Sequence, residues 1–233
     1  SGKNYLVKAY ATDGANKQES PGVSVSFKFD NAVPSSSISI PTNNAKYKSL
    51  ATISGTASDY PAVGNSGLLS VKVSVKNVSD TLWWIGSADV WTTSEFWLTG
   101  TGTSSWTLPS PAWVTGKTYR VRAYAIDNAT NEETLGNGNL FTYDTVAPTA
   151  AIVAPTNGEY LYALSTITGT ASDGTTGINK VQIYIRNTTD TMYWDGGSWI
   201  AGSDEWWLNG TGTTSWNYGA SSSPDWTDGK WYL

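Results

Sequence analysis

The chain of 233 residues repeats a long stretch of its own sequence, and this internal repeat limits the folds open to it. The segment Ile53-Ser-Gly-Thr-Ala-Ser-Asp59 returns with a single difference as Ile167-Thr-Gly-Thr-Ala-Ser-Asp173, about 114 residues later. After a loop that is shorter in the second copy, the sequences match again at Gly100-Thr-Gly-Thr103 and Gly210-Thr-Gly-Thr213. Self-similarity at a fixed period is the signature of one structural unit repeated along a chain.

The beginning of the chain is similar to the end of the first full copy. Residues 2–30 align with residues 116–144, and the alignment pairs Tyr5 with Tyr119. The closing segment Asp228-Gly-Lys-Trp-Tyr-Leu233 has the same pattern once more. Three copies are therefore represented, one of them in full.

This repeat predicts a division of the chain into three parts. Residues 1–33 are expected to be the last strands of one repeat, residues 34–147 a complete repeat, and residues 148–233 the first part of another, lacking its last strands. Two arrangements are open. The chain is either a window of a continuous array, or residues 1–33 of one molecule complete residues 148–233 of the next, head to tail, because unpaired strand edges seek partners.

Within the complete repeat, apolar and polar residues alternate over short segments. Val71, Val73 and Val75 would face one way and the residues between them the other, as in a sheet with one buried face. Turn-forming residues separate the segments. The pattern predicts an all-β sandwich, with strands at residues 36–40, 49–57, 69–77, 81–86, 91–98, 103–108, 117–126 and 138–143.

The composition excludes most catalytic chemistry. The chain has neither His nor Cys, so it cannot form a Ser-His or Cys-His nucleophile pair, a structural zinc site or a disulfide. Its formal net charge of -5 offers no basic field to hold nucleic acid. No apolar run is long enough to span a membrane in this segment. We predict a protein that is not an enzyme and requires no cofactor, in which any metal would bind to oxygen atoms.

Three segments of the complete repeat resemble the bacterial Ig-like tandem repeats of large secreted or surface proteins. They are Gly55-Thr-Ala-Ser-Asp59, Tyr124-Ala-Ile-Asp-Asn-Ala-Thr-Asn131 and Asp144-Thr-Val-Ala-Pro148. The resemblance covers essentially the whole chain and implies tandem Ig-like β-sandwiches, an extracellular or cell-surface location, and a role in adhesion or as a spacer. It carries over no catalytic residue. The chain departs from shorter members by a Trp-rich β-hairpin insertion in each repeat.

Acidic residues recur at the expected domain junctions. In an Ig-like sandwich, the loop after the second strand and the loop before the last strand lie at the end that receives the preceding linker. Converging oxygen atoms there would suit Ca²⁺, which takes six to eight such ligands. The alternative is that these residues cap their own turns. The candidate ligands are Asp30, Asp59, Asp127, Asn128, Asp144 and Asp173.

The thirteen Trp residues lie in the insertions or close after them. Adjacent aromatics on a strand point to opposite faces, so one of each pair should turn away from the core. The outward rings could pair across strands, form a platform for sugar rings, or form a contact surface for another chain. The candidate interaction residues are Trp83, Trp84, Phe96, Trp97, Tyr193, Trp194, Trp206 and Trp207.

Together these patterns predict a non-enzymatic extracellular structural repeat. It would be a building block of a bacterial surface stalk, adhesin or filament assembled end to end, with neighbouring repeats or copies of itself as partners. The alternative is a carbohydrate-binding adhesin module that uses the outward Trp residues on glycans.

Overall fold

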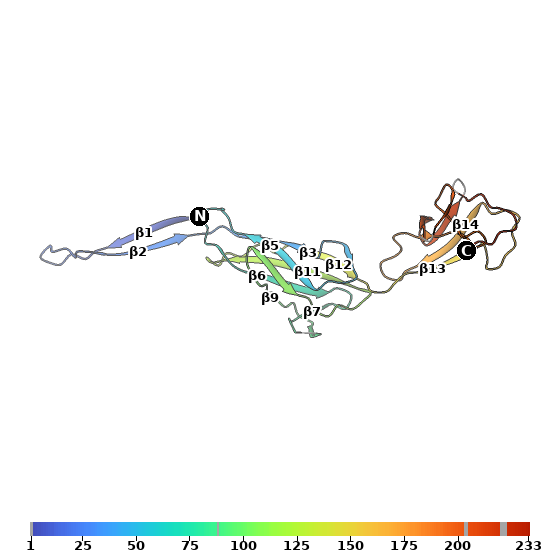
Figure 1. Cartoon of the computed structure of the whole chain (residues 1–233). Helices are drawn as coiled ribbons and strands as arrows, with labels where there is room; N and C mark the ends of the chain where they lie inside the picture. The colour runs from blue at the N-terminus through green and yellow to red at the C-terminus, as the bar shows by residue number, and fades with distance from the viewer. Residues whose placement is uncertain (1, 88, 203–204, 220–222) are drawn as a thin grey trace. The chain divides into compact units, whose positions relative to one another are not determined.

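The computed structural model describes residues 2–87, 89–202, 205–219 and 223–233, and every regular element within these ranges is a β-strand (Figure 1). The chain separates into two compact units, Ser1–Thr145 and Val146–Leu233. In the described residues, no helix is long and apolar enough to cross a membrane.

The first unit begins with a two-stranded antiparallel hairpin of β1 (Lys3–Ala9) and β2 (Val23–Phe29). Tyr5 lies opposite Phe27, and their rings stack with centroids 5.4 Å apart. The corresponding residues of the complete repeat, Tyr119 and Phe141, are also opposite each other and stack at 5.5 Å. The hairpin thus has the register of the last two strands of a repeat, with its apolar side chains exposed.

Residues 34 onward form a sandwich of two sheets. The smaller sheet has the order β10-β5-β3 and the larger the order β4-β12-β11-β6-β7-β8, with β9 also paired to β6. The smaller sheet consists of β3 (Ser35–Ile40), β5 (Thr52–Ser58) and β10 (Ser105–Pro109). The larger sheet consists of β4 (Ala45–Tyr47), β6 (Leu68–Asn77), β7 (Leu82–Trp84), β8 (Trp91–Thr92), β9 (Leu98–Thr99), β11 (Lys117–Asp127) and β12 (Asn139–Tyr143).

Most of the predicted strands are present, with two differences. The prediction of one strand at residues 91–98 is wrong. Two short strands lie at its ends, β8 and β9, and residues 93–97 between them form bends and irregular backbone. The short strand β4, which pairs in parallel with β12, was not predicted from its three residues. The expected hairpin insertion is present as β7 and β8, with Trp84 opposite Trp91.

A single apolar core lies between the two sheets. The alternation in β6 buries Val71, Val73 and Val75 completely, while Lys72 and Lys76 lie on the other face. Aromatic rings also belong to this core, where those of Trp113, Tyr119 and Phe141 all contact one another. The largest fully buried side chains are Trp106, Tyr119 and Phe141.

The buried Trp106 depends on a glycine in the neighbouring strand. Trp106 lies opposite Gly55, and a Cβ atom at Gly55 would come within 2.3 Å of the indole ring and 2.0 Å of the Ser37 carbonyl oxygen. The indole Nε1 donates a hydrogen bond to the Thr56 carbonyl oxygen at 3.2 Å. The same arrangement recurs in the second unit, where a Cβ atom at Gly169 would meet the ring of Trp216 at 2.1 Å.

The second unit repeats the smaller sheet in the order β13-β14-β21-β20. Its other strands form two small sheets, β15 with β19 and β16-β17-β18. The strands are β13 (Thr149–Ala154), β14 (Thr166–Ser172), β15 (Gln182–Ile183), β16 (Arg186–Asn187), β17 (Met192–Trp194), β18 (Trp199–Ala201), β19 (Leu208–Asn209), β20 (Thr211–Gly212) and β21 (Ser215–Gly219).

Both units close the turn after their central strand in the same way. Asn77 donates to the Asp80 carboxylate at 2.9 Å, and the ammonium of Lys117 lies 2.8 Å from that carboxylate and lowers its pKa. In the second unit Asn187 donates to Asp190 at 2.9 Å, and Lys230 takes the place of Lys117. The repeat in sequence is thus also a repeat in side-chain contacts.

Replacing Gly55 with Ala should destabilise the first unit. The added methyl group has no space between the indole of Trp106 and the Ser37 carbonyl, so the sheets must shift, at a cost of about 1–3 kcal/mol. Gly136→Ala is the control, because nothing lies within 4 Å of a Cβ atom there. Urea unfolding of the full chain, followed by tryptophan fluorescence, measures the change. Equal effects of the two substitutions would contradict the packing argument.

Candidate functional site

Three carboxylates converge at one end of the complete repeat. Asp30, Asp59 and Asp127 each offer an oxygen atom, and these three atoms lie within 4.8 Å of one another. Asp127 is completely buried, Asp30 is 8% exposed, and Asp59 is half-buried. The sequence predicted this convergence from the position of each residue at the end of a strand or in the linker.

The three carboxylates come from the ends of three different strands. Asp59 follows β5, Asp127 ends β11, and Asp30 follows β2 of the preceding hairpin. Asp127 lies on the core side of β11 because it continues the alternation of Val121 and Ala125. The site therefore joins the hairpin to the sandwich through side chains that the sheets themselves position.

Backbone amides of one loop hold two of the carboxylates in place. The Ser66 amide donates to Asp30 Oδ2 at 2.6 Å, and the Gly67 amide donates to Asp59 Oδ2 at 2.8 Å. The amide of Ala32 donates to the other oxygen of Asp30 at 3.1 Å. The loop before β6 thus binds the linker, a role that sequence analysis missed because these donors are backbone groups without a residue-type signal.

Asn131 links the buried carboxylate to the linker. Its backbone and side-chain amides both donate to Asp127 at 2.8 Å, and its Nδ2 also donates to the Asp30 carbonyl oxygen at 3.2 Å. Asn128, a predicted ligand, instead donates its side-chain amide to the carbonyl oxygens of Ser66 and Gly67 at 3.0 Å. Asn128 therefore binds the loop before β6, whereas Asn131 binds the Asp127 carboxylate directly.

The two candidate ligands of the second junction belong to different units. Asp144 is 7% exposed and accepts a hydrogen bond from the Thr115 hydroxyl at 3.3 Å. Asp173 accepts the amides of Thr175 and Thr176 in its own turn, and these donors lower its pKa. Asp173 therefore caps its own turn, which is the alternative to Ca²⁺ binding that the sequence left open. Its approach to Asp144 stays a prediction.

The candidate aromatic residues divide into buried and exposed groups. Trp84 and Trp194 are 4% exposed and belong to the cores, and Trp83 lies on the outer face of β7, as alternation predicts. Tyr193 also points outward, but Tyr184 and Arg186 cover it, so that it is 6% exposed. Tyr193 thus turns away from the core, as alternation predicts, but its neighbours leave little of its ring open to solvent.

The other two aromatic pairs are not on strands. Phe96-Trp97 precedes β9 and Trp206-Trp207 precedes β19, so the alternation argument does not apply to them. Phe96, Trp206 and Trp207 are 41%, 49% and 54% exposed. Trp97 folds back onto the larger sheet, where its ring meets Tyr124 edge-on at 4.8 Å.

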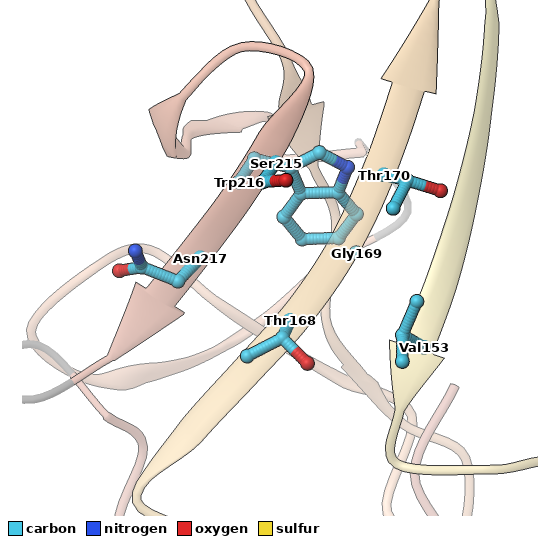
Figure 2. Close-up of a pocket in the computed structure, with 7 residues that line it drawn as sticks. All are labelled: Val153, Thr168, Gly169, Thr170, Ser215, Trp216 and Asn217. Atoms are coloured by element: carbon cyan, nitrogen blue, oxygen red, sulfur yellow. The ribbon is translucent and has the colours of Figure 1, made fainter.

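A shallow groove of about 350 Å³ lies on the four-stranded sheet β13-β14-β21-β20 of the second unit (Figure 2). Figure 2 shows side chains from three neighbouring strands around it, with the indole of Trp216 beside Gly169. The lining residues are Val153, Thr168, Gly169, Thr170, Ser215, Trp216 and Asn217. None of them carries a charge, so this groove holds no group suited to general acid–base catalysis.

Comparison with known proteins identifies the second unit. Residues 148–229 match the family model described as bacterial Ig domain. This segment is therefore a bacterial Ig domain, and the predicted all-β, Ig-like sandwich class is confirmed. Domains of this family usually occur in surface or extracellular proteins and are typically non-enzymatic.

Solved structures offer a more distant likeness. One is a mutant of alpha-2-macroglobulin from Salmonella, with 13% sequence identity and a TM-score of 0.30. The match covers 99% of this chain and 17% of that one, so the chain spans about a sixth of that protein's length. No curated protein matches the chain.

Replacing Asp30 with Ala should release the loop before β6. The Ser66 amide loses a charged acceptor at 2.6 Å, worth about 1.5–3 kcal/mol, so its hydrogen exchange should accelerate roughly tenfold or more. Asp13→Ala is the control, because among the described residues the Asp13 carboxylate accepts hydrogen bonds from the amides of Ala15 and Lys17 alone, in its own hairpin turn. Unchanged exchange at Ser66 in Asp30→Ala would show that the bond does not hold the loop.

Proposed function

We propose that this chain is a structural segment of a bacterial surface stalk or adhesin, in which Ig-like repeats follow one another and each is fastened to the one before it. The observation that supports this proposal is the attachment of Asp30 to the loops after β5 and β11. A linker that passes freely between independent domains would have no such bonds. In a stalk, by contrast, such bonds would hold each repeat in a fixed position relative to the one before it.

The hairpin and the sandwich meet through a short connection. Asp30 and Pro34, the residues that flank it, are both buried, and the Lys28 ammonium donates to the Asn65 carbonyl oxygen at 2.8 Å. These bonds involve residues on both sides of the connection. They therefore restrict how the hairpin can move against the loop before β6.

We further propose that Ca²⁺ binds among Asp30, Asp59 and Asp127. Three carboxylates within 4.8 Å of one another repel, and a divalent cation removes that repulsion while it ties the linker to two strand ends. Calcium tolerates irregular oxygen sites and could recruit further ligands from the carbonyl groups of the surrounding loops and from water. No other cofactor is proposed.

Calcium should raise the thermal stability of the full chain. A ligand at a hundred times its Kd adds about 2.7 kcal/mol, so we expect the melting temperature to be at least about 5 °C higher in millimolar Ca²⁺ than in EDTA. The Asp59→Asn variant should lose this difference. In EDTA it should melt no lower than the unmodified chain, because the amide keeps an acceptor for Gly67 and removes one repelling charge.

The matched control is Asp89→Asn, which removes the same charge from an exposed turn in the insertion. It should keep the full response to Ca²⁺. Equal melting temperatures of the unmodified chain in Ca²⁺ and EDTA, measured by differential scanning fluorimetry, would refute the calcium site. They would leave the stalk function untouched, because the amide bonds to Asp30 need no ion.

Carbohydrate binding is a second candidate function. It is favoured by the aromatic side chains that the insertions leave open to solvent, Phe96 in the first unit and Trp206 and Trp207 in the second. Flat aromatic rings exposed in this way suit the apolar faces of sugar rings. An adhesin module of this kind would bind glycans while its repeats serve as a stalk.

A further inference from the structure

Four of the cations of the first unit lie together on one face. The outer face of the larger sheet, opposite the core, carries the even-numbered residues of β6 and β11. These positions hold the cations Lys72, Lys76, Arg120 and Arg122. The whole chain has 14 Lys and Arg residues and a net charge of -5, so this concentration runs against its overall acidity.

The strand register brings two of these cations into direct opposition. Arg120 lies directly across from Lys76, and like charges in such a pair destabilise a sheet. One acid, Glu95, lies 3.1 Å from Arg122, and another, Glu132, lies opposite Ile126 at the far end of β11. In the residues that the structure describes, the three ion pairs shorter than 4 Å leave Arg120 and Lys76 unneutralised.

Aromatic rings lie beside these cations on the same face. The Lys76 ammonium is 4.2 Å from the centre of the Trp83 ring, and the Arg122 guanidinium is 5.9 Å from that of Trp97. Both rings remain partly exposed. The irregular backbone of residues 93–97 places Trp97 there, with its ring against Tyr124.

The second unit keeps one of these cations, since Arg186 lies over the Tyr193 ring as Lys76 lies over Trp83, but it lacks the like-charged pair. At the positions equivalent to Lys72, Lys76 and Arg120 it has Gln182, Arg186 and Leu233. Leu233 exchanges backbone hydrogen bonds with Arg186, as expected for the residue equivalent to Arg120. Because the second unit folds with Leu233 opposite Arg186, the like-charged pair of Arg120 and Lys76 in the first unit is not needed to stabilise the sheet.

We propose that this basic face, formed by Lys72, Lys76, Arg120 and Arg122 with Trp83 and Trp97, binds a linear acidic polysaccharide. The carboxylate or sulfate groups of such a chain would pair with the cations, and its sugar rings would stack on the exposed parts of the indoles. This inference rests on the second proposed function, glycan binding, names a ligand class for it, and assigns that ligand to the outer face of the larger sheet rather than to Phe96, Trp206 and Trp207. An acidic polysaccharide carries both charged groups and apolar ring faces, and this face offers cations beside indole rings for both.

Isothermal titration calorimetry on the full chain tests the proposal. The probes are polygalacturonate for carboxylates, heparin for sulfates, laminarin as a neutral glycan and polyuridylate as a nucleic acid, each in 50 mM and 300 mM NaCl. The variants are Arg120→Gln and Lys76→Gln. The matched control is Lys180→Gln, which removes one positive charge from an exposed position of the second unit.

We expect at least one of the two acidic polysaccharides to bind, more weakly at high salt, and the one that binds best identifies the charged group. Each face variant should weaken this binding at least tenfold, while Lys180→Gln changes it less than twofold. The melting temperature should stay the same or rise in Arg120→Gln, because a repulsion is removed. A variant that lost binding by unfolding would instead melt earlier.

Three results would overturn the proposal. The first is that neither acidic polysaccharide binds, and the second is that they bind equally to the face variants and the control. The third is that polyuridylate binds more tightly than both at equal salt, which would assign the face to nucleic acid. If laminarin binds in the first of these cases, the acidic ligand is refuted but glycan binding is left in place.

Discussion

The core of the sandwich depends on a Trp ring that packs directly against the backbone of a glycine in the neighbouring strand. Trp106 fills the space beside Gly55 and is completely buried, and the valines of β6 and the rings of Tyr119 and Phe141 complete the same core. A second Trp and Gly pair does the same in the other unit, which has its own core. Because the chain has no disulfide, this packing has no covalent support.

The sequence predicted the fold where one strong pattern determined it. Strict alternation in β6 and the repeat itself gave the strands and their sandwich class, since an alternating strand has one face to bury. Prediction failed at Phe96-Trp97 and Trp206-Trp207, because adjacent aromatic residues indicate a strand and neither pair lies on one. There Trp97 packs against Tyr124 and Trp207 against Tyr184, and these tertiary contacts outweigh the local preference of aromatic residues for strands.

The candidate site was predictable to a similar degree. Acids at strand ends converge because the topology brings those ends together, and Asp30, Asp59 and Asp127 do so. The amides of Ser66 and Gly67 could not be foreseen, since every residue has a backbone amide and only the loop conformation aims it. The basic face needed the register of β6 and β11 as well, because Arg120 and Lys76 are far apart in the sequence.

The bond between Asp30 and Ser66 has a mechanical consequence for a chain held at both ends. A pulling force enters the sandwich through the linker that follows Asp30, and this bond, with that of Asn131 to the Asp30 carbonyl, passes the force to two loops at once. Those loops follow β5 and β11, which belong to different sheets. A force along the linker therefore reaches both layers of the sandwich as well as the edge strand β3 that follows the linker.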